Sequence, residues 1–326
     1  MSQSLMISVS GMRGIVGADL TPELVARHAA ALGAWARAAG RPLVVLGRDS
    51  RTSGAMFAAA ASAGLMSVGC TVIDLGVVPT PTVQLAVTHH RAGAGLILTA
   101  SHNPVEWNAL KLVGPDGIFL GPEAGAAVRA LADEGPTRSG WDGLGSVRED
   151  PGAITRHLEA VLALPEVDVR AIRKRKFKVA IDCVRGAGGL IIPQLLERLH
   201  CVVSAINLEA DGLPHPRSYS TNPRVLGYYV RDHKVLTLED AVRKMTTLPA
   251  QILGLRDRGQ IHEGFAADLV VFDPATVKET NSFEKPKSYP MGIPYTIVNG
   301  VVVIDGGKHT GARPGRALMG RAFETR

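Results

Sequence analysis

A serine with a basic neighbourhood is the clearest candidate for chemistry in this 326-residue sequence. Residues 96–99 read Leu-Ile-Leu-Thr, which is typical of a buried strand, and Ser101 and His102 follow at once. Active sites of α/β sheets lie at the carboxyl ends of strands, where Ser101 can act as a nucleophile and His102 can transfer protons. Lys111 can balance phosphate charge. The alternative for the same residues is a capping turn without chemistry.

A second candidate lies near the N-terminus. Residues 10–14 read Ser-Gly-Met-Arg-Gly, and this spacing predicts a tight loop from which Arg13 can reach over a phosphate. The formal net charge is +6, which suits anionic small substrates. The one basic run, residues 173–176, has no interleaved aromatic residues, so it indicates a solvated face and argues against nucleic-acid binding.

Strands alternating with helices must position these residues. Thr21 and Pro22 form a helix start, and Ser53 is placed to cap a second, Ala-rich helix. Short apolar runs separate the helical segments, which predicts an α/β layer with a mostly parallel sheet. The expected strands are residues 43–46, 71–75, 96–99, 178–182 and 202–206, and later β-like runs are residues 268–273 and 296–304.

Four segments together resemble the α-D-phosphohexomutase superfamily. Within it, they are most similar to the phosphoglucosamine mutase-like and phosphomannomutase-like members. Residues 99–104, with Asn108 and Lys111 downstream, resemble its phosphoserine loop, although Ala109 replaces the usual glycine. Residues 10–14 resemble its N-terminal arginine loop. The other two segments are Gly-Arg-Asp-Ser-Arg (47–51) and Val-Pro-Thr-Pro-Thr (78–82). The resemblance runs from about residue 7 to residue 208.

The resemblance implies a phosphohexose mutase that works through a phosphoserine on Ser101. The serine would phosphorylate a hexose phosphate, and the resulting bisphosphate would return its other phosphate to Ser101. A magnesium ion, held through the phosphate on Ser101, would neutralise the transferring group. The implied catalytic residues are Ser101, His102, Arg13 and Lys111, and the implied substrate-binding residues are Ser10, Arg13, Asn103, Asn108 and Lys111.

Three later segments of that family are absent from the sequence. They are the three-aspartate magnesium loop, the sugar-selecting loop and the C-terminal phosphate-binding loop. The tail instead resembles the C-terminal end of N-acyl-D-amino-acid deacylases, in the amidohydrolase superfamily, for example over residues 264–274 and 309–316. Asp211 falls where the two families read alike, and it is the candidate catalytic residue of a deacylase-like alternative. The sequence therefore reads as a chimera.

We expect an α/β protein with three parts: a phosphohexomutase-type domain at 1–134, a partial second α/β domain at 150–210, and a segment of short helices and strands at 211–326. Three functions stay open: a mutase impaired by its missing loops, a metal-dependent deacylase-related hydrolase, or a non-catalytic fusion product. The expected partner is a hexose phosphate or bisphosphate. Three cysteines without a CxxC pair, no signal peptide and no long apolar run predict a cytoplasmic protein that binds no membrane.

Overall fold

The computed structural model describes residues 5–8, 11–101, 103–211, 217–282, 288–316 and 318, and the chain divides into two compact units, Met1–Leu213 and Pro214–Arg326. The division lies close to the expected join near Asp211. None of the described helices is both long enough and apolar enough to cross a membrane.

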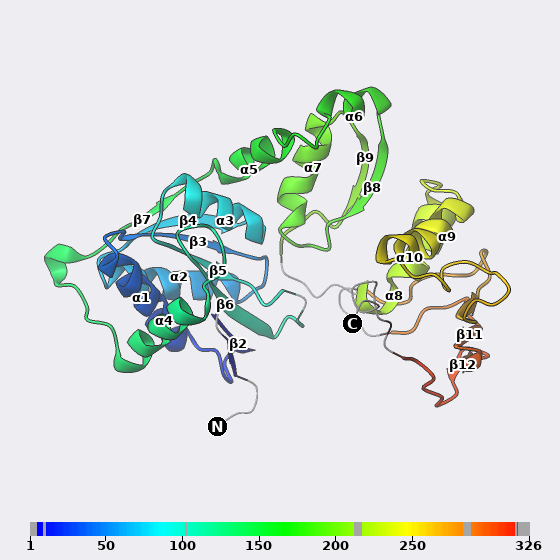
Figure 1. Ribbon diagram of the computed structural model, residues 1–326, viewed down its shortest axis with the longest axis horizontal. Coiled ribbons are helices and arrows are strands. Elements are labelled where there is room, and N and C mark those ends of the chain that lie inside the picture. The colour runs from blue at the N-terminus through cyan, green and yellow to red at the C-terminus, as the bar shows by residue number, and fades with distance from the viewer. Residues whose placement is uncertain are drawn as a thin grey trace. The chain divides into compact units, whose positions relative to one another are not determined.

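The first unit is built on a seven-stranded sheet in the order β1-β2-β6-β5-β3-β4-β7 (Figure 1). Neighbours among β5, β3, β4 and β7 are parallel, whereas β6 is antiparallel to β5 and to β2. This confirms the expected mixed, mostly parallel sheet. The strands are β1 (Met6–Ser8), β2 (Gly11–Ile15), β3 (Leu43–Arg48), β4 (Thr71–Val77), β5 (Ala94–Leu98), β6 (Trp107–Val113) and β7 (Val147–Glu149).

Helices cover both faces of this sheet (Figure 1). Leu96 and Leu98 point into the cluster with α1, α2 and α4, whereas Ile97 points into the cluster with α3, because successive side chains of a strand alternate between faces. Each such fully buried side chain stabilises the fold by about 1.5–3 kcal/mol. The helices are α1 (Pro22–Ala38), α2 (Gly54–Met66), α3 (Thr80–His89) and α4 (Pro122–Glu134), with a short 3-10 turn η1 (Trp141–Gly143) before β7.

Local capping was predicted with mixed success. The Thr21 hydroxyl accepts from the Leu24 N–H at 3.4 Å, as expected of an N-cap at the start of α1. Ser53 precedes α2, but its hydroxyl caps no helical N–H; it instead accepts a hydrogen bond from the Asn108 side chain at 2.9 Å. The predicted cap was wrong because the Ser53 backbone is helical, with φ of −73° and ψ of −9°, whereas an N-cap residue is typically extended.

The rest of the first unit is a small α/β layer with a two-stranded parallel sheet. Its elements are α5 (Ala153–Leu162), α6 (Val169–Arg175), β8 (Lys178–Asp182), α7 (Gly188–Arg198) and β9 (Val202–Ile206). Thr82 of α3 and His157 of α5 are joined by a hydrogen bond of 2.8 Å between Oγ1 and Nδ1. At the first residue after β7, Asp150 pairs with His90 at 2.8 Å and with Arg156. These contacts fix α5 against α3.

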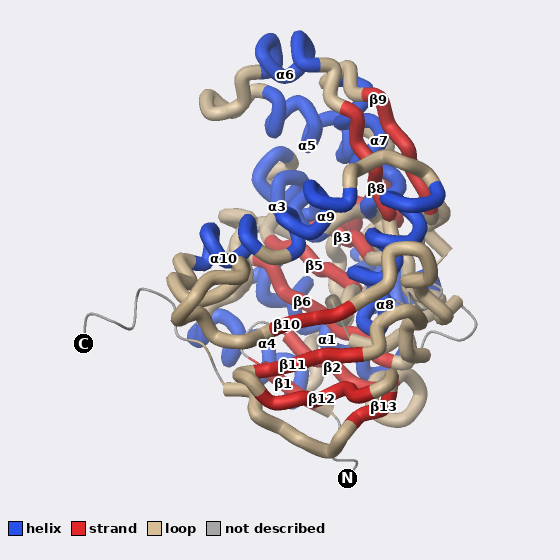
Figure 2. The backbone as a smooth tube through the Cα atoms, turned by 90° about the vertical axis from the view of Figure 1, so that its right-hand side faces the viewer, coloured by secondary structure: helices blue, strands red, loops and turns tan. Residues whose placement is uncertain are grey.

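The second unit combines short helices with a four-stranded antiparallel sheet, β10-β11-β12-β13 (Figure 2). The β-like run at 296–304 is a hairpin of two strands, because Asn299 and Gly300 both adopt positive φ and turn the chain. The elements are α8 (Arg217–Arg224), the π-helix η2 (Val225–Asp232), α9 (Leu238–Met245), α10 (Thr247–Leu253), β10 (Leu269–Val271), β11 (Tyr295–Val298), β12 (Val301–Asp305) and β13 (Lys308–His309).

Candidate active site

Ser101 is an exposed residue on the turn that follows the fully buried strand β5. Its backbone is left-handed, with φ of 57°, a conformation that costs a residue with a side chain about 1–2 kcal/mol. The Ser101 N–H donates to Thr99 Oγ1 at 3.1 Å, which closes the turn. The serine therefore stands in the place predicted for it, at the carboxyl end of a central strand.

The turn is held from inside the protein by Arg51, which follows the neighbouring strand β3. The Arg51 side chain is only 10% exposed. Its Nη2 donates to the carbonyls of Ser101 at 3.1 Å and Asn103 at 2.7 Å. Its Nη1 donates to the carbonyls of Pro104 at 2.5 Å and Trp107 at 2.9 Å. One guanidinium thus binds four carbonyls of the loop that carries Ser101.

Asp49 fixes this arginine in turn. Its Oδ2 accepts from Arg51 Nε at 3.1 Å, and its Oδ1 accepts from the Arg51 backbone N–H at 3.0 Å. The Asp49 N–H itself donates to the Leu98 carbonyl at 3.0 Å, at the end of β5. The sequence reasoning gave Asp49 and Arg51 no individual role. The signal was the Gly-Arg-Asp-Ser-Arg run directly after a buried strand.

Arg13 and Lys111 lie on one face of the sheet beside this loop. Arg13 of β2 is opposite Ala109 of β6, and Lys111 stands two residues further along β6, so both side chains point to the same face. The Thr99 N–H donates to the Ala109 carbonyl at 3.0 Å, so the chain leaves β5 for Ser101 in the same row as Arg13. Two strand spacings separate the Arg13 and Thr99 backbones by about 10 Å, within reach of long basic side chains.

The two cations differ in their surroundings. Arg13 is exposed, and its Nε donates to Met6 Sδ at 3.2 Å. Lys111 is half-buried, with its Nζ 5.8 Å from the centroid of the Phe119 ring. The tight loop expected around Arg13 is wrong, because residues 11–15 form strand β2 and pair with β6. Gly11 allows this close pairing, because a Cβ there would stand 1.9 Å from the Leu110 carbonyl oxygen.

Among the other candidates, Asn103 is half-buried in the loop and Asn108 is completely buried. The Asn108 Nδ2 donates to Ser53 Oγ, and its Oδ1 accepts from the Ala109 N–H at 2.8 Å. The structure therefore places Asn108 beneath the loop as an internal support. Ser10 and His102 lie outside the described residues, so their roles stay predictions.

The small α/β layer adjoins the site through Ser50, whose hydroxyl donates to the Arg185 carbonyl at 2.9 Å. Arg185 follows β8 and is itself left-handed, with φ of 53°. Its side chain forms an ion pair with Asp211, the residue of the deacylase-like alternative. Asp211 is thus engaged with a cation from the mutase-like part of the chain.

Magnesium does not fit the described residues by themselves. They contain no group of three His, Cys, Asp or Glu side chains arranged to hold a metal. Asp49 lies near the loop, but Arg51 engages both of its oxygens. Mg²⁺ requires a near-octahedral set of oxygen ligands. A phosphate on Ser101 would supply part of that set, and the remainder would have to come from solvent or substrate.

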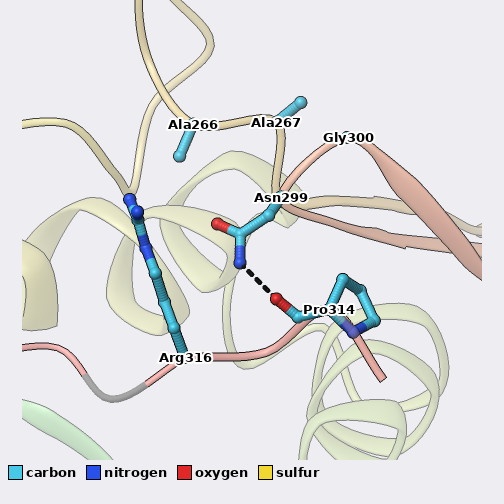
Figure 3. Close-up of a pocket in the computed structure, with 6 residues that line it drawn as sticks. All are labelled: Ala266, Ala267, Asn299, Gly300, Pro314 and Arg316. Atoms are coloured by element: carbon cyan, nitrogen blue, oxygen red, sulfur yellow. Dashed lines mark hydrogen bonds between the residues drawn. The ribbon is translucent and has the colours of Figure 1, made fainter. Parts of the chain in front are cut away.

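The second unit has a cavity of about 440 Å³ beside the β11–β12 turn (Figure 3). The Asn299 Nδ2 donates to the Pro314 carbonyl at 2.7 Å across one side of it. The Asn299 Oδ1 accepts from Arg258 at 3.1 Å, so the amide is used inside the protein. The lining residues are Ala266, Ala267, Asn299, Gly300, Pro314 and Arg316.

Comparison with known proteins separates the chain into two families. Residues 5–138 match the model described as "Phosphoglucomutase/phosphomannomutase, alpha/beta/alpha domain I", and residues 155–238 match its domain II. Residues 213–304 match the "Amidohydrolase family". The two kinds of match overlap between 213 and 238, around the place where the sequence predicted a join.

Individual relatives agree. A phosphoglucomutase/phosphomannomutase of Thermococcus kodakarensis is 42% identical over 62% of this chain and 44% of its own length. A phosphoglucosamine mutase of Symbiobacterium thermophilum is 39% identical over 70% of this chain and 51% of its own. A phosphomannomutase structure from Thermus thermophilus has a TM-score of 0.59 and 29% identity, and covers 70% of this chain and 53% of that one.

The tail has a D-aminoacylase crystal structure as a neighbour, 44% identical over 37% of this chain and 26% of that one, with a TM-score of 0.31. The chain spans about half the length of the curated mutases that it matches. The chimeric arrangement predicted from sequence is confirmed by the domain matches. The chain thus joins a phosphoglucomutase/phosphomannomutase-type domain I and part of domain II to a C-terminal segment similar to the amidohydrolase family.

Proposed function

We propose that the first unit carries out phosphohexomutase-type phosphoryl transfer, with Ser101 as the group that accepts and returns the phosphoryl. One observation carries the proposal above the others: Ser101 is exposed at the carboxyl end of a central strand, on a loop fixed from below. Arg13 and Lys111 add positive charge on one face beside it. Similarity to proteins named phosphoglucomutase/phosphomannomutase and phosphoglucosamine mutase supports a hexose phosphate as substrate.

The proposed step begins with a hexose bisphosphate. Ser101 Oγ attacks one phosphorus, a bond from Oγ to phosphorus forms, and the bond from that phosphorus to the sugar oxygen breaks. The serine proton passes to a nearby base, for which the sequence offers His102. The departing sugar oxygen takes up a proton from the same base, and a hexose monophosphate leaves. Arg13 and Lys111 stabilise the charge on the phosphoryl oxygens, which is the main task of a phosphoryl-transfer site.

The complete isomerisation needs more than this step. Magnesium is expected from the family resemblance, and the described residues do not fit it unaided. We therefore propose that Ser101 exchanges phosphoryl groups while the complete isomerisation is slow. We also propose that the protein is located in the cytoplasm. The sugar-selecting loop of the family, which the sequence lacks, would choose among glucose, mannose and glucosamine phosphates.

Intact-mass analysis after incubation with a hexose 1,6-bisphosphate tests the proposal. We expect a gain of one phosphoryl group, about 80 Da, in the unaltered chain and none in Ser101→Ala. Ser146→Ala is the matched control, because Ser146 is also exposed but lies at the amino end of β7. A mass gain in Ser101→Ala equal to that of the unaltered chain would contradict the assignment. No gain in any variant would favour a non-catalytic fusion product.

A further inference from the structure

All five N–H donors of the Arg51 guanidinium are used. Nε–H binds Asp49, and the four Nη–H groups bind the carbonyls of Ser101, Asn103, Pro104 and Trp107. Five is the full donor capacity of an arginine side chain. Arg51 is therefore a buried cation whose donors are all directed at one loop and one carboxylate.

We propose that Arg51 is the positioning residue of the Ser101 loop: it holds the serine in its left-handed conformation, ready to accept a phosphoryl group. The effect of Arg51 on catalysis rests on the proposed function. The hydrogen bonds between Arg51 and the Ser101 loop do not depend on that function. Arg51 is 90% buried, so it acts through the loop backbone and leaves the substrate contacts to other residues.

The carbonyls of the Ser101 loop point inward, toward Arg51. Four of them accept hydrogen bonds from the single Arg51 guanidinium, over a span of seven residues from Ser101 to Trp107. Fixing the Ser101 carbonyl inward at φ of 57° leaves its side chain on the exposed side. A left-handed residue with a side chain persists only where its surroundings determine it. Arg51 supplies these surroundings directly at the Ser101 carbonyl.

Lysine cannot replace this arrangement. Its ammonium has three donors at a single point, whereas the guanidinium is a planar fork that serves both ends of the loop at once. Asp49 completes the device, because it orients the fork and balances its charge. Arg51→Lys should therefore keep a positive charge in the interior and lose the geometry.

The test compares Arg51→Lys with Arg27→Lys. Arg27 is a matched control, because its guanidinium also binds two backbone carbonyls, those of Ala132 and Asp133, away from the site. The first measurement is hydrogen exchange of the amides at 101–108 without substrate. We expect faster exchange there in Arg51→Lys only. The second is the rate of Ser101 phosphorylation by a hexose 1,6-bisphosphate. A misplacement of about 1 Å lowers such rates about 100-fold, so we expect that loss in the maximal rate.

The half-saturating bisphosphate concentration should stay nearly constant, because Arg51 makes no substrate contact. Added guanidinium ion should restore part of the rate to Arg51→Ala, a rescue that a general loss of stability would not allow. Unchanged exchange at 101–108 in Arg51→Lys would overturn the inference, whatever the activity. If the unaltered chain gains no phosphate, the proposed function fails, and hydrogen exchange still decides the role of Arg51.

Discussion

Replacement of Asn108 by alanine should destabilise the first unit strongly, because its side chain is fully buried with both ends of the amide hydrogen-bonded. The change removes the partner of the Ser53 hydroxyl and that of the Ala109 N–H. Leaving a buried polar group such as the Ala109 N–H unpartnered costs about 1–3 kcal/mol, and the hydroxyl of the half-buried Ser53 adds about 1 kcal/mol. The free energy of unfolding should therefore fall by about 2–4 kcal/mol.

For a unit of this size, 1 kcal/mol corresponds to about 2–4 °C in the melting temperature, so the expected decrease is about 4–16 °C. Differential scanning calorimetry measures it. Asn103→Ala is the matched control from the same loop: Asn103 uses its backbone N–H and carbonyl there, so the change should cost less than about 0.5 kcal/mol.

Asn108→Asp sharpens the test. A carboxyl group in this buried position should be held neutral by desolvation, with a raised pKa. The folded state then binds more protons than the unfolded state, so the stability of Asn108→Asp should improve as the pH falls from 7 towards 4. A melting temperature of Asn108→Ala within about 1 °C of the unaltered chain would refute the support role. A raised half-saturating substrate concentration at unchanged stability would instead indicate direct substrate contact.

Three further outcomes are expected. Burial lowers the pKa of His157, so the stability that this residue contributes is present above the ordinary histidine pKa of about 6.5 and is lost as the pH falls. In urea titrations between pH 7.5 and 5.5, His157→Gln should weaken the fall of the unfolding free energy with pH. An equal fall in the variant and in the unaltered chain would contradict this role of His157. Magnesium should bind weakly without substrate, since the described residues offer no ligand cluster, and calorimetry that finds micromolar affinity would contradict this. The two units should unfold in two transitions, with Pro214–Arg326 first because its buried cluster is small; a single sharp transition would show one shared core.

The sequence by itself determined the parts of this protein that depend on local pattern. Short apolar runs predicted β3, β4 and β5 of the large sheet, and β5 is buried throughout, because burial on both faces requires continuous apolar side chains. The bounds of β8 and β9 were also predicted, although both strands are only half-buried or exposed. The strands β1, β2, β6 and β7 were not predicted. Combined motifs placed Ser101 after the central strand and located the join near Asp211. The hairpin at Asn299 and Gly300 also had a local signal, which the sequence reasoning did not use.

Only the tertiary structure decided which distant groups meet. Arg51 lies 50 residues before Ser101 in sequence, and the two come together because β3 and β5 are parallel neighbours whose loops emerge at the same edge. The same packing brings the Ser53 hydroxyl to the side chain of Asn108. Local pattern cannot reveal such contacts, since each depends on the order of strands in the sheet and on which buried polar groups remain to be satisfied.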